Sequence, residues 1–182
     1  MAKARLRQLT MACIAALLAE GSASAATQGS LGTTSAGSIS IGASIPNRVQ
    51  LSGLSDVSLL NQDPATPASN AQDVCIWSNT STRGYNVTAS GNGAGSAFTL
   101  ANGALSVPYS VEWAGSSGQS SGTSLASGTA MTGLTSAATN PTCSSGLSNS
   151  ASLIVRISSA NLQSMQAATT YTGTLTLVVA PE

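Results

Sequence analysis

Residues 37–45 read GSISIGASI, and this stretch decides the fold expected for the whole chain. Apolar residues stand at every second position: Ile39, Ile41, Ala43 and Ile45. This alternation is typical of a β-strand with one apolar face, and Pro46 ends it. Burying the four side chains would contribute on the order of 5 to 8 kcal/mol of apolar transfer free energy. Left in water, they form an exposed apolar strand edge that tends to pair with other chains. The strand therefore requires an acceptor, either in the chain's own sheet or in another molecule.

The first 25 residues have the pattern of a secretory signal peptide. Three basic residues precede an apolar run over about 11–19, and Ala23-Ser24-Ala25 fits a cleavage site. The run is too short to span a bilayer. We expect a signal peptide over 1–25, an N-terminal arm over 26–46 and one β-domain over 47–182, a length that suits a single core.

Charge and composition exclude several classes of function. After residue 25, the chain has three arginines, no lysine and no histidine, against five carboxylates, so its net charge is −2. No basic cluster is present to neutralise phosphates, which excludes nucleic acid as a partner. The absence of histidine removes the commonest general base and metal ligand. We expect no enzyme activity, no catalytic residue, no metal and no cofactor.

Two cysteines, Cys75 and Cys143, remain after the signal peptide. An even number of cysteines in an exported chain predicts a disulfide. Closing a loop of this size would stabilise the fold by roughly 4 kcal/mol in the chain-entropy model.

The rest of the chain reads as short strands separated by turn-forming residues, which indicates an all-β sandwich or barrel. In the run 151–158, for example, Leu153, Val155 and Ile157 alternate with Ser152, Arg156 and Ser158, although Ile154 interrupts the polar face. Helix is expected only over 161–168, for one or two turns. We predict strands over 38–45, 47–52, 56–60, 73–78, 84–90, 96–100, 106–113, 151–158 and 171–179.

The remaining residues of chemical interest are assigned to structure. Trp77 and Trp113 lie on apolar faces or beside Cys75, which favours core packing over a sugar-binding platform. Asp56 and Asp63 have no catalytic or calcium-binding spacing and are expected to be solvated turn residues. The Gly/Ser-rich segment 115–128 is expected to be a surface loop, with a linker between domains as the alternative.

The order of these features resembles the chaperone-usher pilins, above all the archaic and alternative clades that include spore-coat-protein-U-like subunits. The shared features are the alternating arm, the proline break, the cysteine pair and the closing run YTGTLTLVV at 171–179. The resemblance covers about residues 37–179. It implies an incomplete immunoglobulin-like β-sandwich that lacks one strand and is completed by donor-strand exchange.

The resemblance also implies roles for residues and partners. The donor residues are Ile39, Ile41, Ala43 and Ile45, and the disulfide joins Cys75 to Cys143. The acceptor groove is lined by Val49, Leu51, Leu175, Leu177 and Val179. The partners are identical subunits joined head to tail, a periplasmic chaperone and an outer-membrane usher, with a surface or host receptor left open. The chain would pass through the periplasm to the bacterial cell surface as a fimbrial subunit supporting adhesion or biofilm formation.

Two alternatives remain at this level. A minor or tip adhesin would bind a host glycan, but such subunits usually carry an extra receptor domain and lack a donor arm. A self-complemented secreted β-sandwich would fold the arm back onto its own sheet.

Overall fold

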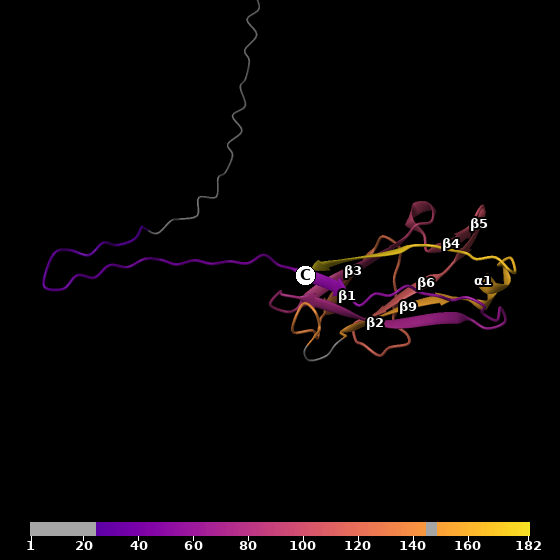
Figure 1. Ribbon diagram of the computed structural model, residues 1–182. Helices are drawn as coiled ribbons and strands as arrows, with labels where there is room; N and C mark the ends of the chain where they lie inside the picture. Colours follow the sequence, from indigo (N-terminus) through magenta and orange to yellow (C-terminus); the bar gives the residue numbers. More distant parts are fainter. Residues whose placement is uncertain (1–24, 145–148) are drawn as a thin grey trace, which may run out of the picture. The chain divides into compact units, whose positions relative to one another are not determined.

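The computed structural model describes residues 25–144 and 149–182 (Figure 1). The chain divides into two units, residues 1–45 and 46–182, and each is described by itself. Of the signal peptide expected over 1–25, only Ala25 lies among the described residues.

Two antiparallel sheets form the body of the second unit (Figure 1). The first sheet contains, in spatial order, β1 (Val49–Ser52), β2 (Ala68–Ser78), β9 (Ala151–Ile157), β6 (Ser110–Ala114) and β7 (Thr123–Ser124). The second contains β10 (Leu175–Pro181), β3 (Gly84–Gly91) and β8 (Ala130–Thr135). A separate hairpin joins β4 (Thr99–Asn102) to β5 (Leu105–Pro108), and the short helices are η1 (Ala94–Ser96) and α1 (Ser159–Gln163). The fold is all-β, a sandwich of two antiparallel sheets, as the sequence predicted.

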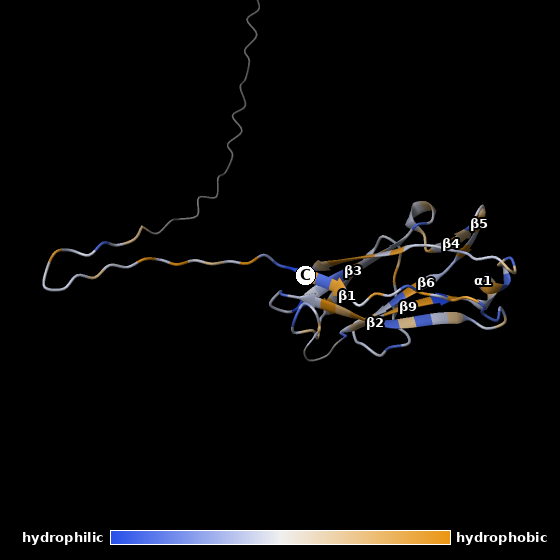
Figure 2. Ribbon diagram, in the orientation of Figure 1, coloured by the Kyte–Doolittle hydropathy of each residue, from blue (hydrophilic) through white to orange (hydrophobic). Residues whose placement is uncertain are grey.

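Side chains from both sheets fill the core between them. The apolar run along β9 is visible in Figure 2, and five of its seven residues are apolar. Trp113 of β6 and Tyr85 of β3 are fully buried, and their rings meet edge to face with centroids 6.5 Å apart. The Trp113 indole Nε1–H donates to the Tyr85 hydroxyl at 3.2 Å. This pair joins the two sheets and satisfies both polar atoms inside the core.

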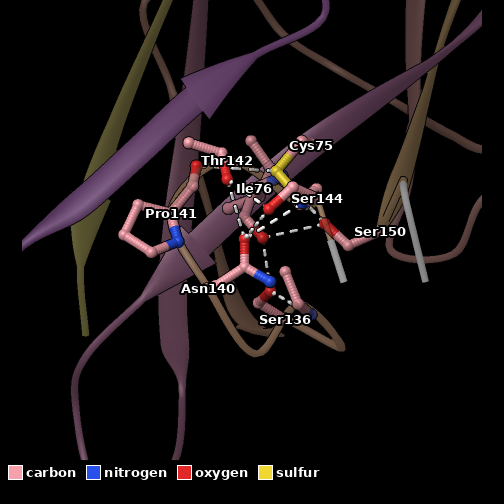
Figure 3. The surroundings of a disulfide bond; sticks show 10 residues. Cys75, Ile76, Ser136, Asn140, Pro141, Thr142, Ser144 and Ser150 are labelled. Atoms are coloured by element: carbon pink, nitrogen blue, oxygen red, sulfur yellow. Dashed lines mark hydrogen bonds between the residues drawn. A yellow bond between two sulfur atoms is a disulfide. The ribbon is translucent and has the colours of Figure 1, made fainter. Parts of the chain in front are cut away.

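The disulfide fastens the end of β2 to the loop that precedes β9. Cys75 and Cys143 are bonded, with Cα atoms 6.1 Å apart (Figure 3). β2 no longer pairs with β9 at Ile76, and serine hydroxyls bind the backbone N–H and C=O of this residue instead. Ser150 Oγ accepts from the Ile76 N–H and donates to its C=O, both at 2.8 Å, and Ser136 Oγ also donates to that C=O. The disulfide predicted from the cysteine count is therefore present in the structure.

Polar contacts hold the Gly/Ser-rich segment 115–128 against the first sheet. Asp73 accepts from Ser152 Oγ at 2.6 Å and from the Gly118 N–H at 2.7 Å, and these two bonds lower the pKa of the Asp73 carboxyl. Glu112 pairs with Arg156 at 3.0 Å and accepts from the Gly122 N–H. Apart from β7 (Thr123–Ser124), which pairs with β6, the segment is a loop within one compact unit, so the linker alternative is wrong.

Most of the expected strands are present. The predictions at 47–52, 73–78, 84–90, 96–100, 106–113, 151–158 and 171–179 correspond to β1, β2, β3, β4, β5 with β6, β9 and β10. The run 106–113 is divided at Tyr109, whose N–H donates to the Phe98 C=O, so β5 and β6 belong to different sheets. The helix begins at Ser159, earlier than expected, because Ser158 Oγ caps it by accepting from the Asn161 N–H.

Two expected strands are not strands in the structure. Residues 56–60 have no ladder partner among the described residues, and the preceding Ser55 is held by the side chain of Gln72 instead of by a strand. Within 38–45 only Ser38 pairs, with Thr27. The short strands β7 and β8 were not predicted, since β7 has two residues and Gly133 interrupts the pattern of β8.

The buried tyrosines predict a fall in stability at alkaline pH. Burial raises the pKa of Tyr85 above its ordinary value of 10.0, and burial also raises the pKa of Tyr109. A phenol with a higher pKa in the folded state contributes stability that is complete below the unfolded value and is lost as pH rises through the folded one. We expect the free energy of unfolding of the sandwich to fall above about pH 10. Tyr85→Phe should make this fall shallower, and an unchanged pH dependence in denaturant titrations would contradict the assignment.

Candidate functional site

The sandwich has four sheet edges, and two of them are poor templates for an added strand. β7, at one edge, contains two residues. β8, at another, has a bulge opposite β3 between Tyr85 and Val87, and Gly133 lies there with φ of 73°. Short strands and bulges are the usual means by which an edge is protected from pairing. The edges formed by β1 and β10 have neither protection.

The outer edge of β10 presents unpaired backbone groups. The Glu182 N–H donates to the Gly84 C=O, and the Thr174 N–H donates to Asn92 Oδ1, so even-numbered residues direct their backbone groups toward β3. Backbone groups alternate in direction along an antiparallel strand. Leu175, Leu177 and Val179 therefore point their N–H and C=O groups outward, where no strand of the described residues pairs with them. Pro181, which has no N–H, ends this edge.

The outer edge of β1 is open in the same way. The Asn79 N–H donates to the Arg48 C=O, which fixes the phase of pairing with β2 and turns the backbone groups of Val49 and Leu51 outward. Cα atoms of β1 and β10 come within 8 Å of each other. The two unprotected edges thus lie on the same side of the sandwich.

A groove of about 1470 Å³ opens beside these two edges. Its walls are the segment 54–64, which follows β1, and the segment 165–177, which leads into β10. Its floor is part of the apolar core and consists of Leu100, Tyr109, Leu153, Val155, Ile157 and Leu162. Along the first wall, Leu54 and Leu60 remain 49% and 60% exposed. The groove therefore combines an apolar floor with partly exposed apolar walls.

Two anchors shape the walls. The carboxamide of Gln72 accepts from the Ser55 N–H at 2.8 Å and donates to the Ser55 C=O at 3.1 Å, which holds the start of the first wall to β2. On the other wall, Thr172 exchanges backbone hydrogen bonds of 2.8 and 2.9 Å with Ala101 of β4. Gly173 follows so closely that a Cβ there would lie 2.6 Å from the Thr99 carbonyl oxygen. This wall therefore tolerates no side chain at residue 173 without movement of the backbone.

The arm exposes its apolar residues. Ile39, Ile41 and Ile45 have 73%, 87% and 81% of their surface accessible. Near its start, Thr27 and Ser38 exchange backbone hydrogen bonds of 2.9 and 3.1 Å. Residues 39–45 have no strand partner among the described residues. The arm is thus an unpaired extended segment with alternating apolar side chains.

The structure brings together only some of the predicted groove residues. Leu175 and Leu177 line the groove, whereas Val49, Leu51 and Val179 lie on the two open edge strands outside its lining. The sequence prediction missed both walls, 54–64 and 165–174, and the floor contributed by β9. Alternation in Leu153, Val155 and Ile157 marked β9 as a core strand, but nothing in it distinguished an open core from a closed one.

The other residues considered earlier have structural positions. Trp113 is in the core and Trp77 packs beside the disulfide cluster. Asp63 forms a turn by accepting from the Ala65 N–H at 2.9 Å, and Asp56 lines the groove. Among residues 25–144 and 149–182, no three His, Cys, Asp or Glu side chains gather to hold a metal ion. The same residues contain no helix long and apolar enough to cross a bilayer.

Comparison with known proteins finds likenesses among solved structures. No family model and no curated protein matches the chain. A solved structure described as a chaperone-tip adhesin complex in CFA/I fimbriae biogenesis is similar, with 13% sequence identity and a TM-score of 0.47. The similarity covers 75% of this chain and 41% of that one, so this chain spans less than half of its length. A likeness this remote bears on neither the function nor the role of any residue.

Proposed function

We propose that this protein is the structural subunit of a surface filament, in which the arm of one copy fills the groove of the next by strand addition. The observation that carries the proposal is the unpaired outer edge of β10 beside an apolar groove, in a chain that also bears an exposed arm of alternating apolar residues. Strand addition satisfies both features at once, because the arm supplies main-chain hydrogen bonds and alternate side chains together.

The dimensions of the arm and the open edge agree. β10 has seven residues, and the stretch from Ile39 to Ile45 also has seven. At about 3.3 Å per residue, each extends for roughly 23 Å. An arm paired with β10 would place its isoleucines over the floor and its serines toward solvent.

The energy of the exchange favours the pairing. Transferring the exposed isoleucines and Ala43 from water to the groove would contribute on the order of 5 to 8 kcal/mol. The outward backbone groups of Leu175, Leu177 and Val179 would gain partners in the same step. Both the donor and the acceptor surface leave water, so the assembled state is more stable than separate subunits.

The geometry of donation leads to a filament. The arm and the groove are different surfaces, so contacts between identical subunits are head to tail and need not close into a ring. An empty groove would also promote aggregation before assembly. On the basis of the pilin resemblance, the proposal includes a periplasmic chaperone that covers the groove, an outer-membrane usher, and a role of the filament in adhesion or biofilm formation.

Removing the arm tests the proposal directly. Deletion of residues 37–45 should leave a chain with an unfilled groove that is marginally stable and aggregates. A synthetic peptide of sequence GSISIGASI, added in trans, should bind and raise its unfolding temperature. A truncated chain that is as stable as the full one and has no affinity for the peptide would remove the support for strand donation.

A charge at an inward arm position should block assembly. Ile41→Asp places a carboxylate against the apolar floor, where its desolvation is costly, so filaments should be absent while the subunit is still exported. Ser40→Asp is the matched control, because residue 40 lies on the opposite face of the arm, and it should assemble. Filaments are counted by electron microscopy and export by immunoblotting of periplasm. Equal assembly of the two variants would show that the arm has no buried face.

The shape of the groove wall should also limit binding. Gly173→Ala puts a methyl group 2.6 Å from a backbone oxygen of β4 and should displace the wall. Overpacking of this kind typically costs 1 to 3 kcal/mol, so we expect the arm peptide to bind the arm-deleted chain about tenfold more weakly. Gly115→Ala is the control, since its Cβ would meet only Leu134 Cδ2, at 3.7 Å. Unchanged affinity in titration calorimetry would place the peptide away from this wall.

A further inference from the structure

Asn79 binds the sandwich's first residues with three hydrogen bonds. It lies directly after β2, and its Oδ1 accepts from the Arg48 N–H at 2.6 Å. Its Nδ2 donates to the Pro46 C=O at 3.0 Å, and its own N–H donates to the Arg48 C=O at 3.1 Å. In the described part of the chain, these are the only hydrogen bonds made by residues 46–48.

The side-chain amide of Asn79 makes hydrogen bonds that a neighbouring strand would otherwise make. The ladder between β1 and β2 begins at Val49, which pairs with Ser78. One residue earlier, at Arg48, the Asn79 side chain accepts from the N–H that β2 would otherwise bind. Pro46 offers only a C=O, and the donor half of the same amide satisfies it. A carboxamide carries an acceptor and a donor on two separate atoms of one planar group, whereas an ionised aspartate only accepts and a serine has a single oxygen for both functions.

We propose that Asn79 is the positioning residue that fixes the root of the arm. It holds the backbone of residues 46–48 to the end of β2, so that the arm's rotational freedom begins at Ile45. This proposal rests on the proposed donor function for its role in the filament, where the direction of the arm sets the placement of the next subunit. The placement of the next subunit would then depend on the side-chain amide of Asn79 rather than on the ladder between β1 and β2.

Trypsin reports directly on this contact. Arg48 is the only arginine or lysine between residues 8 and 82, so cleavage after it separates the arm from the sandwich. A protease needs an extended, released segment around the cleaved bond, and Asn79 restrains that segment. In the exported full chain, Asn79→Ala should raise the rate of cleavage after Arg48 about tenfold, the size expected for two hydrogen bonds of ordinary net strength.

Arg83 serves as the internal reference. It lies in a turn closed by its own N–H to the Thr80 C=O, and its C=O accepts from the Ser136 N–H. Its cleavage should not change in Asn79→Ala. Asn70→Ala is the matched control and should change neither rate, because Asn70 is a half-buried asparagine on β2 whose side chain makes no hydrogen bond within residues 25–144 and 149–182. Asn79→Asp keeps the acceptor for Arg48 and loses the donor to Pro46, so its rate should be intermediate.

Two results would overturn the proposal. The first is a trypsin result without selectivity for Arg48. Either the rate of cleavage after Arg48 is unchanged, or the rates after Arg48 and Arg83 rise together, which would indicate general destabilisation. The other is an unaltered spread of angles between successive subunits in Asn79→Ala filaments imaged by cryo-electron microscopy, since a loosened root should widen it. Failure of the donor function would appear differently, as the absence of filaments from the unmutated chain, while the trypsin measurement would still be valid.

Discussion

The rest of the structure depends on the outer edge of β10, where backbone hydrogen-bonding groups have no strand partner. Leu175, Leu177 and Val179 direct backbone N–H and C=O groups away from β3, and no described strand meets them. Beside that edge the core is open as a groove whose floor includes Val155 and Ile157. Unpaired backbone next to apolar surface is where an added strand gains most, because one event supplies both hydrogen bonds and buried side chains.

The rest of the sandwich restricts pairing to this one side. β7 is too short to serve as a template, and the bulge at Gly133 distorts β8. At the end of β2 the disulfide and the hydroxyls of Ser136 and Ser150 replace the missing ladder, so the backbone of Ile76 is closed to other partners. Edges that would recruit strands without selectivity are blocked, and specificity follows from which edge remains free.

The sequence predicted the strands whose faces differ in polarity, and it failed where tertiary contacts decide. Alternation identified β3, which buries mainly one face, and β9, whose alternating Leu153, Val155 and Ile157 lie in the core although the strand is buried on both faces. The segment 56–60 alternates from Asp56 to Leu59, yet it is a groove wall that pairs with no strand of the described residues. The groove predictions reached Leu175 and Leu177 from the closing strand. They missed the floor, because core residues give the same apolar sequence pattern whether they line a groove or are fully covered.

The neutrality of the arm and the groove has a consequence for how they meet. The arm over 26–46 carries no charged side chain, and among the described residues Asp56 is the only charged one that lines the groove. Complementary charges raise association rates by steering partners together, and neither surface offers them. Encounters between free subunits would therefore proceed at the slow, unsteered rate, while the exposed isoleucines of the arm stay open to non-specific apolar contacts. An assembly of this kind needs a factor that covers the groove and delivers the next arm at high local concentration, which is the role proposed here for the chaperone and the usher.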